Sequence, residues 1–154
     1  MSTESGTTGH RIVVGVDGSE SSRAALSWAV RQAGLTGATV EAVIAWHYPV
    51  VAGGMPFAPV AMLEGSDFTG YAARTLQDTI TAAVDPASTV KVSSTVSQGN
   101  AARILLDAAS GADMLVVGSR GHGGFAEALL GSVSQHCVHH AACPVVIIRD
   151  APAQ

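Results

Sequence analysis

Short apolar runs return at intervals along the chain. The first, Arg11–Val16, is rich in β-branched residues and apolar on both faces, which is typical of a central parallel strand. Similar runs occupy Thr39–Trp46, Met114–Val117 and Val145–Ile148. Val90–Val96 instead alternates apolar and polar residues, as a strand near a sheet edge does. The pattern therefore predicts five strands.

Between these runs lie segments in which apolar residues recur at helical spacing. Ser19 stands directly before the first of them, where its hydroxyl can cap a helix N-terminus, and Gly34 is a suitable C-terminal stop. The second ends before Pro86, because a proline disfavours helical backbone in the residue that precedes it. The helices predicted in this way are the segment between Ser19 and Gly34, Tyr71–Val84, Ala101–Ala109 and Ser132–Ala142.

Strands and helices thus alternate along the chain. Such alternation predicts an α/β fold with a single doubly wound parallel sheet, right-handed crossovers and helices on both faces. In these sheets, ligands bind beyond the carboxyl ends of the strands, where the winding reverses. The 154 residues fit one domain, which we expect over residues 10–150, after a flexible leader (1–9) and before a short tail (151–154). Tyr48–Gly70 has no clean period, and a long loop is expected there.

The composition narrows the class of protein. Apolar residues make up 47% and charged residues 13%, which excludes an intrinsically disordered chain. The formal net charge is −4 and Lys91 is the one lysine, so we expect no nucleic-acid surface. No apolar stretch approaches the roughly 18 residues of a membrane span, and Met1–His10 lacks the apolar segment of a signal peptide. Cys137 and Cys143 do not make a disulfide framework. Together, these observations lead us to expect a cytoplasmic protein that does not bind a membrane.

Two loops at predicted strand ends carry the candidate chemistry, Gly15–Ser19 (GVDGS) and Gly118–Ser134 (GSRGHGGFAEALLGSVS). They face each other if the first and fourth strands are neighbours. The glycines of the second loop let the backbone approach a ligand, and Gly131-Ser132 opens a helix whose free N–H groups favour an anion. Serine hydroxyls and the charge of Arg120 can complete a phosphate cradle that contains no lysine. Glycine-rich loops without a ligand have the same composition, so the glycines alone do not decide the question.

The carboxylate of Asp17 has two roles open to it. At a strand end it can bond a ribose hydroxyl or help to hold a Mg²⁺ ion that bridges phosphates. It can instead form an Asx turn at the start of the next helix. We interpret the neighbouring Ser19 as an N-cap rather than a ligand.

Histidine and cysteine residues gather towards the end of the chain, between His136 and Cys143. On a helix, His136, His140 and Cys143 would share one face, and such residues can bind zinc. Their spacing matches no standard zinc motif. We therefore interpret the histidines as favourable groups near a helix C-terminus and expect no metal site made by the protein alone.

A specific spacing links the second loop to a known family. Gly118-x-x-Gly121, nine residues, and then Gly131-Ser132 match the ATP-binding signature G-x2-G-x9-G-[S/T]. The flanking segments VVGVDGS and Cys143-Pro144 before VVIIR fit as well. On these residues the chain resembles the universal stress protein family, in the subgroup that keeps the ATP-binding signature. The resemblance covers essentially His10–Asp150.

The resemblance implies a fold, a ligand and an assembly. The implied fold is a five-stranded parallel sheet of order 3-2-1-4-5, dimerised through the last strand, Val145–Ile148, and the implied ligand is ATP. The resemblance implies contacts from Gly15, Val16 and Asp17 to the adenosine end, and from the backbone of Ala45 to the adenine edge. It places Val117 and Gly118 under the ribose and phosphates. It also implies N–H groups of Gly121, Gly131, Ser132 and Val133 at the phosphates, with Ser134 close by; Arg120, which the resemblance does not include, is either a further charge there or a solvent-exposed loop residue.

Three functions remain open on these residues. The first is a regulatory module of the stress response whose partner surface depends on bound ATP. The second is a slow ATPase or a protein that phosphorylates itself on Ser132 or Ser134, although the sequence offers no lysine and no convincing general base near the phosphates. In the third, the same site takes AMP or cyclic AMP.

Overall fold

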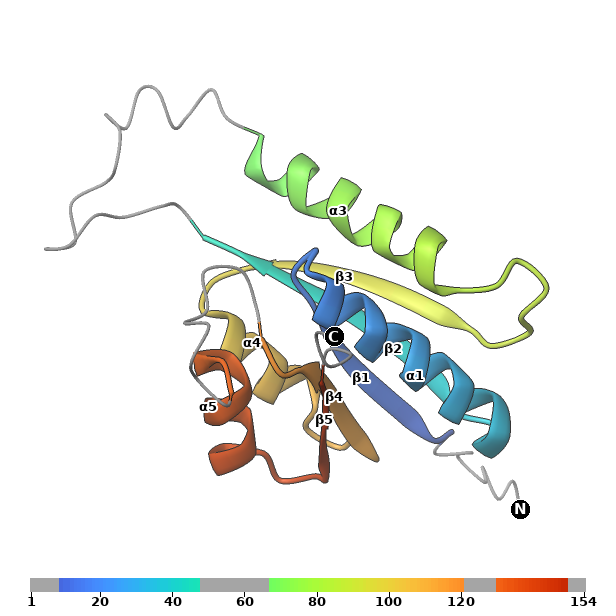
Figure 1. Ribbon diagram of the computed structural model, residues 1–154. Helices are drawn as coiled ribbons and strands as arrows, with labels where there is room; N and C mark the ends of the chain where they lie inside the picture. Colours follow the sequence, from blue (N-terminus) through green and yellow to red (C-terminus); the bar gives the residue numbers. More distant parts are fainter. Residues whose placement is uncertain (1–8, 48–66, 121–129, 150–154) are drawn as a thin grey trace, which may run out of the picture.

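The computed structural model describes residues 9–47, 67–120 and 130–149. Its centre is a parallel sheet of five strands in the order β3-β2-β1-β4-β5 (Figure 1). The predicted fold class and strand order are therefore confirmed. The elements are β1 (Arg11–Val16), α1 (Glu20–Thr36), β2 (Thr39–Trp46), α3 (Phe68–Ala83), β3 (Val92–Gln98), α4 (Ala101–Ala108), β4 (Met114–Gly118), α5 (Ser132–His140) and β5 (Val145–Ile148).

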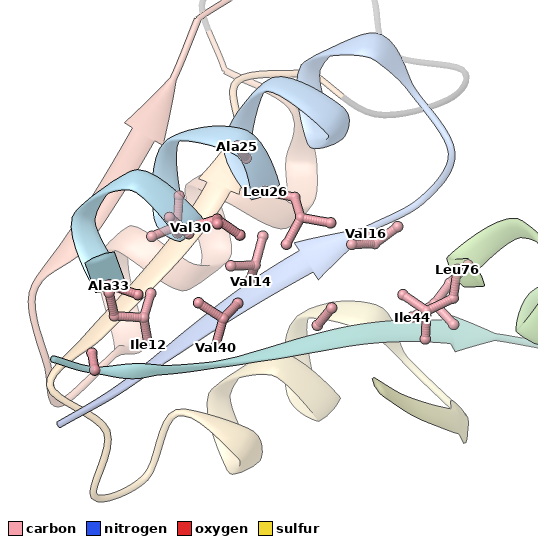
Figure 2. Close-up of a cluster of buried hydrophobic side chains, with 14 of the residues drawn as sticks. Ile12, Val14, Val16, Ala25, Leu26, Val30, Ala33, Val40, Ile44 and Leu76 are labelled. Carbon is pink, nitrogen blue, oxygen red and sulfur yellow. The ribbon is translucent and has the colours of Figure 1, made fainter. Parts of the chain in front are cut away.

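Helices α1 and α3 cover one face of the sheet, and α4 and α5 cover the other (Figure 1). Successive strand residues point to opposite faces, so β1 supplies Val14 to the first face and Val13 to the second. Figure 2 shows Leu26 and Val30 of α1 beside Val14 in the core of the first face. On the second face, Leu105 of α4 is buried with Val13 in a separate cluster. Both faces of the central strands are thus buried, as in doubly wound sheets.

The end of α1 differs from the sequence prediction. The helix continues through Gly34 and ends at Thr36, so the prediction that Gly34 stops it was wrong. The stop is Gly37, which has a φ of +79° and whose N–H donates to the carbonyl oxygen of Ala33 at 2.9 Å. A residue without Cβ adopts this left-handed conformation at little cost, so the helix ends there.

Helix α3 begins at Phe68, three residues before the predicted start at Tyr71. Asp67 sets this start, since its Oδ1 accepts a 2.7 Å hydrogen bond from the N–H of Gly70. The end of the loop predicted over Tyr48–Gly70 is therefore helical. Residues 48–66 of that loop lie outside the described residues.

The edge strand β3 runs over Val92–Gln98, two residues later than the predicted Val90–Val96. Pairing with β2 extends as far as Trp46 opposite Gln98, so the ladder continues past the predicted end. Val90 instead packs its side chain against the first core cluster. Smaller differences concern β4, which includes Gly118, α4, which ends at Ala108, and α5, which ends at His140.

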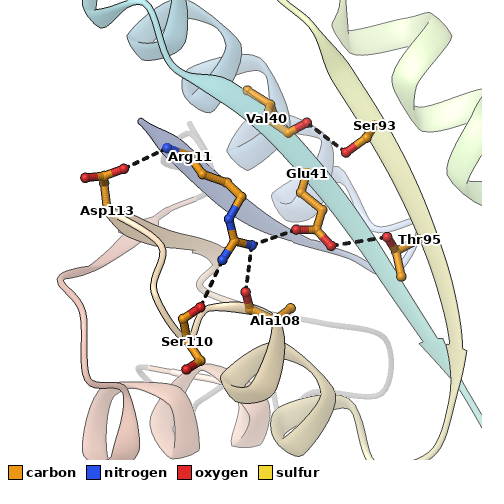
Figure 3. A network of polar contacts seen from close by, with 8 residues as sticks. All are labelled: Arg11, Val40, Glu41, Ser93, Thr95, Ala108, Ser110 and Asp113. Carbon is orange, nitrogen blue, oxygen red and sulfur yellow. Dashed lines mark hydrogen bonds and ion pairs between the residues drawn. The ribbon is translucent and has the colours of Figure 1, made fainter. Parts of the chain in front are cut away.

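A polar network closes the amino end of the sheet (Figure 3). Arg11 Nη1 forms a 2.8 Å ion pair with Glu41 Oε2, and Thr95 donates to the other carboxylate oxygen at 3.2 Å. The same guanidinium donates to the carbonyl oxygens of Ala108 and Ser110 at the end of α4, at 2.8 and 2.9 Å. A cation thus occupies the negative end of the α4 dipole, where it binds the carbonyl oxygens of the last helical residue, Ala108, and of Ser110 just beyond it.

Candidate functional site

Strands β1 and β4 are neighbours, with Val14 paired to Val116. Helix α1, which follows β1, covers one face of the sheet, whereas α4, which precedes β4, covers the other. The winding therefore reverses between these two strands, and their carboxyl ends form the switch point at which doubly wound sheets bind ligands. The two candidate loops were expected to face each other if their strands were neighbours. That β1 and β4 are neighbours is confirmed.

The first loop forms a tight turn around Asp17. Its Oδ1 accepts a 2.9 Å hydrogen bond from the N–H of Ser19, with Gly18 between them at a φ of +83°. This is the Asx turn that the sequence left open as one of two roles. The second carboxylate oxygen, Oδ2, has no hydrogen-bond partner among the described residues, and the side chain is half-buried. One oxygen thus shapes the turn, and the other is available to a ligand.

The second loop is fastened to the first through serine residues. Ser19 caps α1 by accepting from the N–H of Ser22 at 3.2 Å, and its hydroxyl lies 3.5 Å from the carbonyl oxygen of Arg120, to which it donates. Ser21 Oγ accepts from the N–H of Arg120 at 3.4 Å and donates to the carbonyl oxygen of Ile148 at 3.3 Å. The start of α1 therefore holds the chain that leaves β4.

Gly118 lies under this contact. A Cβ placed on it would meet the Oγ of Ser21 as well as the Cβ and the backbone carbonyl carbon of Ser21, both at 2.8 Å. The carbonyl carbon belongs to the first turn of α1 and does not move independently. Glycine is thus required here for the helix to sit on the strand, whether or not a ligand binds.

Gly15 has the equivalent role on the opposite face. Its added Cβ would lie 2.8 Å from a terminal methyl carbon of Leu105 in α4 and 3.4 Å from Val117. The methyl group belongs to a flexible side chain, so this contact is easier to relieve than that at Gly118. Both glycines therefore bring a helix close to the switch point, one on each face of the sheet.

The start of α5 supplies hydrogen-bond donors. Gly131 is the N-cap and provides no side-chain cap, and the first bond within the helix runs from Gln135 N–H to the carbonyl oxygen of Gly131. The amides of Ser132, Val133 and Ser134 have no partner among the residues that the structure describes. Unpaired amides and the positive end of the helix dipole favour an anion at this position.

The amide of Gly131 does not join this group. It donates to the carbonyl oxygen of Ser119 at 2.7 Å, and the hydroxyl of the buried Ser134 lies 3.4 Å from the same oxygen and 3.2 Å from the carbonyl oxygen of Gly131. These bonds tie together the two ends of the glycine-rich segment. The Ser134 side chain is thus engaged with the backbone, whereas the hydroxyl of Ser132 is exposed.

The remaining predicted residues contribute backbone to this edge. Val16 and Val117 are buried in the cores of opposite faces, so only their main-chain groups are left for a ligand. Ile44 pairs with Val16, which places the half-buried Ala45 level with Asp17 on the neighbouring strand. The exposed side chain of Arg120 follows β4, and Gly121 lies outside the described residues.

Sequence reasoning missed two residues of this site, Ser21 and Ser119. Both are buried, with exposed fractions of 2% and 4%. A serine on the inward face of α1, opposite a glycine at a strand end, was the available signal for Ser21. No comparable pattern marks Ser119, since its carbonyl oxygen rather than its side chain makes the contacts.

Free cysteines lie away from this edge, in the second core cluster. Burial raises the pKa of the Cys137 thiol to about 11, with a smaller contribution from Cys143. Burial also raises the pKa of Cys143. Both thiols are therefore protonated at neutral pH and are poor nucleophiles. None of the helices in the described residues is long and apolar enough to cross a membrane.

Comparison with known proteins adds an independent observation. The model of a family described as the universal stress protein family matches residues 9–149. A universal stress protein of Mycolicibacterium smegmatis is 34% identical over 146 residues, which is 92% of this chain and 49% of that protein. The chain spans about half the length of the curated relatives it matches.

Solved structures agree in fold. A universal stress protein in complex with cAMP is 25% identical, with a TM-score of 0.62 over 91% of this chain and 96% of the other. A universal stress protein from Archaeoglobus fulgidus in complex with dAMP is 20% identical, with a TM-score of 0.54 over 90% and 97%. At its level of identity, the second of these shows a common fold alone.

Proposed function

Because the chain belongs to the universal stress protein family, we propose that the switch-point edge of its sheet binds an adenine nucleotide, and that this nucleotide is ATP. One observation carries the proposal: the amides of Ser132, Val133 and Ser134, which have no partner among the described residues, begin α5 beside the carboxyl end of β4. The complex of a similar protein with cAMP supports the adenine class. The spacing of Gly118, Gly121 and Gly131-Ser132 supports a phosphate chain.

The adenosine end lies on β1 and β2 in this proposal. The backbone of Gly15, Val16 and Asp17 forms its floor, and the main chain of Ala45 recognises the adenine edge from the neighbouring strand. Oδ2 of Asp17, which has no partner among the described residues, bonds a ribose hydroxyl, since Oδ1 is held by the N–H of Ser19. Val117 and Gly118 lie under the ribose and the phosphates because neither places a side chain over the edge.

The phosphate end lies at the start of α5. The amides of Ser132, Val133 and Ser134 donate to phosphate oxygens, and the exposed hydroxyl of Ser132 adds a donor. Gly131 contributes by leaving space at the N-cap rather than by its amide, which is bonded to Ser119. Arg120 and Gly121 complete the set that the sequence predicts. A Mg²⁺ ion held by the phosphates would balance their charge, and Asp17 is the one carboxylate of the predicted set that would contact it.

A proline at residue 132 tests the central claim. Ser132 is the first residue of α5, where proline is well tolerated, and Gly131 already has the extended backbone (φ −68°, ψ 164°) that proline imposes on its predecessor. Ser132→Pro therefore deletes one backbone donor and leaves the helix intact. Loss of a hydrogen bond to a charged group costs about 1.5–3 kcal/mol, so we expect Kd for ATP to rise by about tenfold or more.

The matched control is Ser132→Ala, which keeps the amide and loses the hydroxyl. Titration calorimetry with Mg-ATP should show a smaller loss for this variant, and urea unfolding should show equal stability for both. Equal affinity of the wild type and Ser132→Pro would reject the amide cradle. Competition among ATP, ADP, AMP and cyclic AMP for the same site identifies the preferred nucleotide.

We propose a regulatory module of the stress response in which bound ATP changes the surface that partners meet. Phosphate release above that of a boiled control, lost in Asp17→Ala, would instead indicate the slow ATPase. Ser134 is an unfavourable acceptor for self-phosphorylation because its hydroxyl is buried and bonded to backbone carbonyls.

Assembly and compartment belong to the same proposal. Strand β5 ends the sheet on one side, and its residues Val145–Ile148 are apolar and only half-buried in one chain. An apolar edge strand of this kind pairs readily with another, so we propose a homodimer through β5. A sedimentation mass equal to one chain would contradict it. The free cysteines suit the reducing conditions of the cytoplasm.

A further inference from the structure

Helix α5 carries two imidazoles that the nucleotide site does not use. His136 and His140 are one helical turn apart, and their ring centroids lie 4.5 Å from each other with planes inclined by 38°. Both side chains are exposed. His139 projects from a different part of the helix, with its ring centroid 6.5 Å from that of His140.

This spacing suits a transition-metal ion. Imidazole nitrogens bind Zn²⁺ at about 2.0–2.1 Å, so two of them on one tetrahedral ion lie about 3.4 Å apart. Rings with centroids 4.5 Å apart and free to rotate in solvent can bring one nitrogen each to that separation. The pair spans the last turn of α5, where a cation also meets the negative end of the helix dipole.

Against the expectation from the sequence that the protein alone makes no metal site, we propose that His136 and His140 form a two-histidine site for a divalent transition metal of the Zn²⁺, Ni²⁺ or Cu²⁺ type. Among the described residues, no group of three or more histidine, cysteine or acidic side chains is placed to hold a metal. Water therefore completes the coordination. Cys143, the third member suggested by the sequence, packs instead against the second core cluster. The proposal stands independently of the nucleotide site.

Metal preference follows from the ligands. Two neutral nitrogens favour Cu²⁺ over Ni²⁺ and Zn²⁺, in line with the general order of stability for these ions. Mg²⁺ requires oxygen ligands and should not bind here. A bound ion would also link residues one turn apart, so it should raise the midpoint of thermal unfolding.

Titration calorimetry of the full, untagged, chelator-treated chain with ZnCl₂ tests the site. We expect one ion per chain in the wild type, and an affinity that falls by about tenfold or more in both His136→Ala and His140→Ala, since each leaves a single ligand. His139→Ala is the matched control on the same exposed helix and should change the affinity by less than about twofold. None of these exposed positions packs in the core.

Paramagnetic resonance of the Cu²⁺-loaded chain supplies a second readout. The wild type and His139→Ala should show two coordinated imidazole nitrogens, whereas His136→Ala and His140→Ala should show one. Equal zinc affinities in all four proteins, or an equal loss in His139→Ala, would overturn the proposal and leave only adventitious binding by scattered histidines.

Discussion

The two ends of the parallel sheet are built from different chemistry. At the amino end, charged side chains complete the structure: Arg11 pairs with Glu41 and also binds the last carbonyls of α4 (Figure 3). At the carboxyl end, glycine and serine residues bring the backbone close together, as at Gly118 and Ser21. One end satisfies a helix C-terminus from within the chain, whereas at the other the first amides of α5 have no partner in the part of the chain that the structure describes.

This difference separates stability from binding. Helix ends need partners for their terminal carbonyls and amides, and those partners come from side chains, water or ligands. Arg11 already donates to the carbonyl oxygens of Ala108 and Ser110 at the end of α4, so a ligand there would compete with a side chain of the protein. The amides of α5 are held in position by the bonds among Ser119, Gly131 and Ser134 and are left open. A ligand can gain most at the carboxyl end.

The largest effect is expected from Gly118→Ala. Its Cβ would meet the backbone of Ser21 at 2.8 Å, so α1 must shift, and overpacking of this kind costs about 3 kcal/mol of unfolding free energy. Gly15→Ala meets only a terminal methyl of Leu105 and should cost about 1 kcal/mol. Urea unfolding of both variants checks the order.

The helical, exposed Gly34 is the control for these two substitutions. Its added Cβ would lie 3.7 Å from Val90, an ordinary contact, so Gly34→Ala should stabilise the protein by about 0.5–1 kcal/mol. If Gly118→Ala proved as stable as the wild type, the close seating of α1 at the carboxyl end would be wrong. A loss of nucleotide binding in Gly118→Ala alone would not identify a ligand contact, because the helix start moves with it.

A smaller effect should follow from Arg11→Met at the other end of the sheet. The variant loses the ion pair with Glu41 and two bonds to carbonyl oxygens, and it leaves a carboxylate that is only 23% exposed without its cation. We expect a loss of about 2 kcal/mol in unfolding free energy. Kd for ATP should stay unchanged, since none of the predicted site residues that the structure describes forms a hydrogen bond or ion pair with Arg11.

Glu41→Gln and the double variant complete a cycle for this pair. A coupling energy near zero would show that the ion pair adds nothing beyond the bonds to α4. A change in nucleotide affinity in Arg11→Met would contradict the separation of the two ends.

Much of this comparison could be predicted from the sequence, because periodicity reports on local structure. The bounds of β1, β2 and β5 were predicted correctly, and so was the N-cap at Ser19. Gly34 misled because a glycine inside a helix resembles a stop until its φ is known. The apolar and polar alternation that starts at Val90 also misled, because it begins two residues before β3. Pairing with β2, rather than the local pattern, sets where β3 begins and ends.

Contacts between segments far apart in the sequence were harder to predict from it. The spacing from Gly118 to Ser132 located the cradle, but the use of the Gly131 amide by Ser119 depends on how the chain closes on itself. The network around Arg11 joins four elements that no local pattern connects. Ser119 acts through its backbone, so the type of its side chain does not indicate its role.

The smallest effect concerns Asp113, which belongs to the charged amino end. The backbone N–H of Arg11 donates to Asp113 Oδ2 at 2.7 Å, and His10 Nδ1 lies 3.3 Å from Oδ1. These hydrogen bonds, that from Arg11 first, lower the pKa of the Asp113 carboxyl below its ordinary value of 3.8. A carboxyl whose pKa is lower in the folded chain than in the unfolded chain stabilises the fold at pH values above its unfolded-state pKa. This stabilisation is lost as the pH falls through its folded-state pKa.

The stability advantage of the wild type over Asp113→Asn should therefore be present above about pH 5 and should shrink progressively as the pH falls below that value. Urea unfolding of both proteins across this pH range measures the stability advantage. Added salt should reduce only the part that comes from the ion pair with His10, because salt screens the attraction between exposed charges. An advantage that grew as the pH fell below about 5 would mean that Asp113 is held in its protonated form, and the amino end would then not depend on the ionised carboxylate. Nucleotide affinity should be the same in the two proteins at every pH, since Asp113 and the start of α5 lie at opposite ends of the sheet.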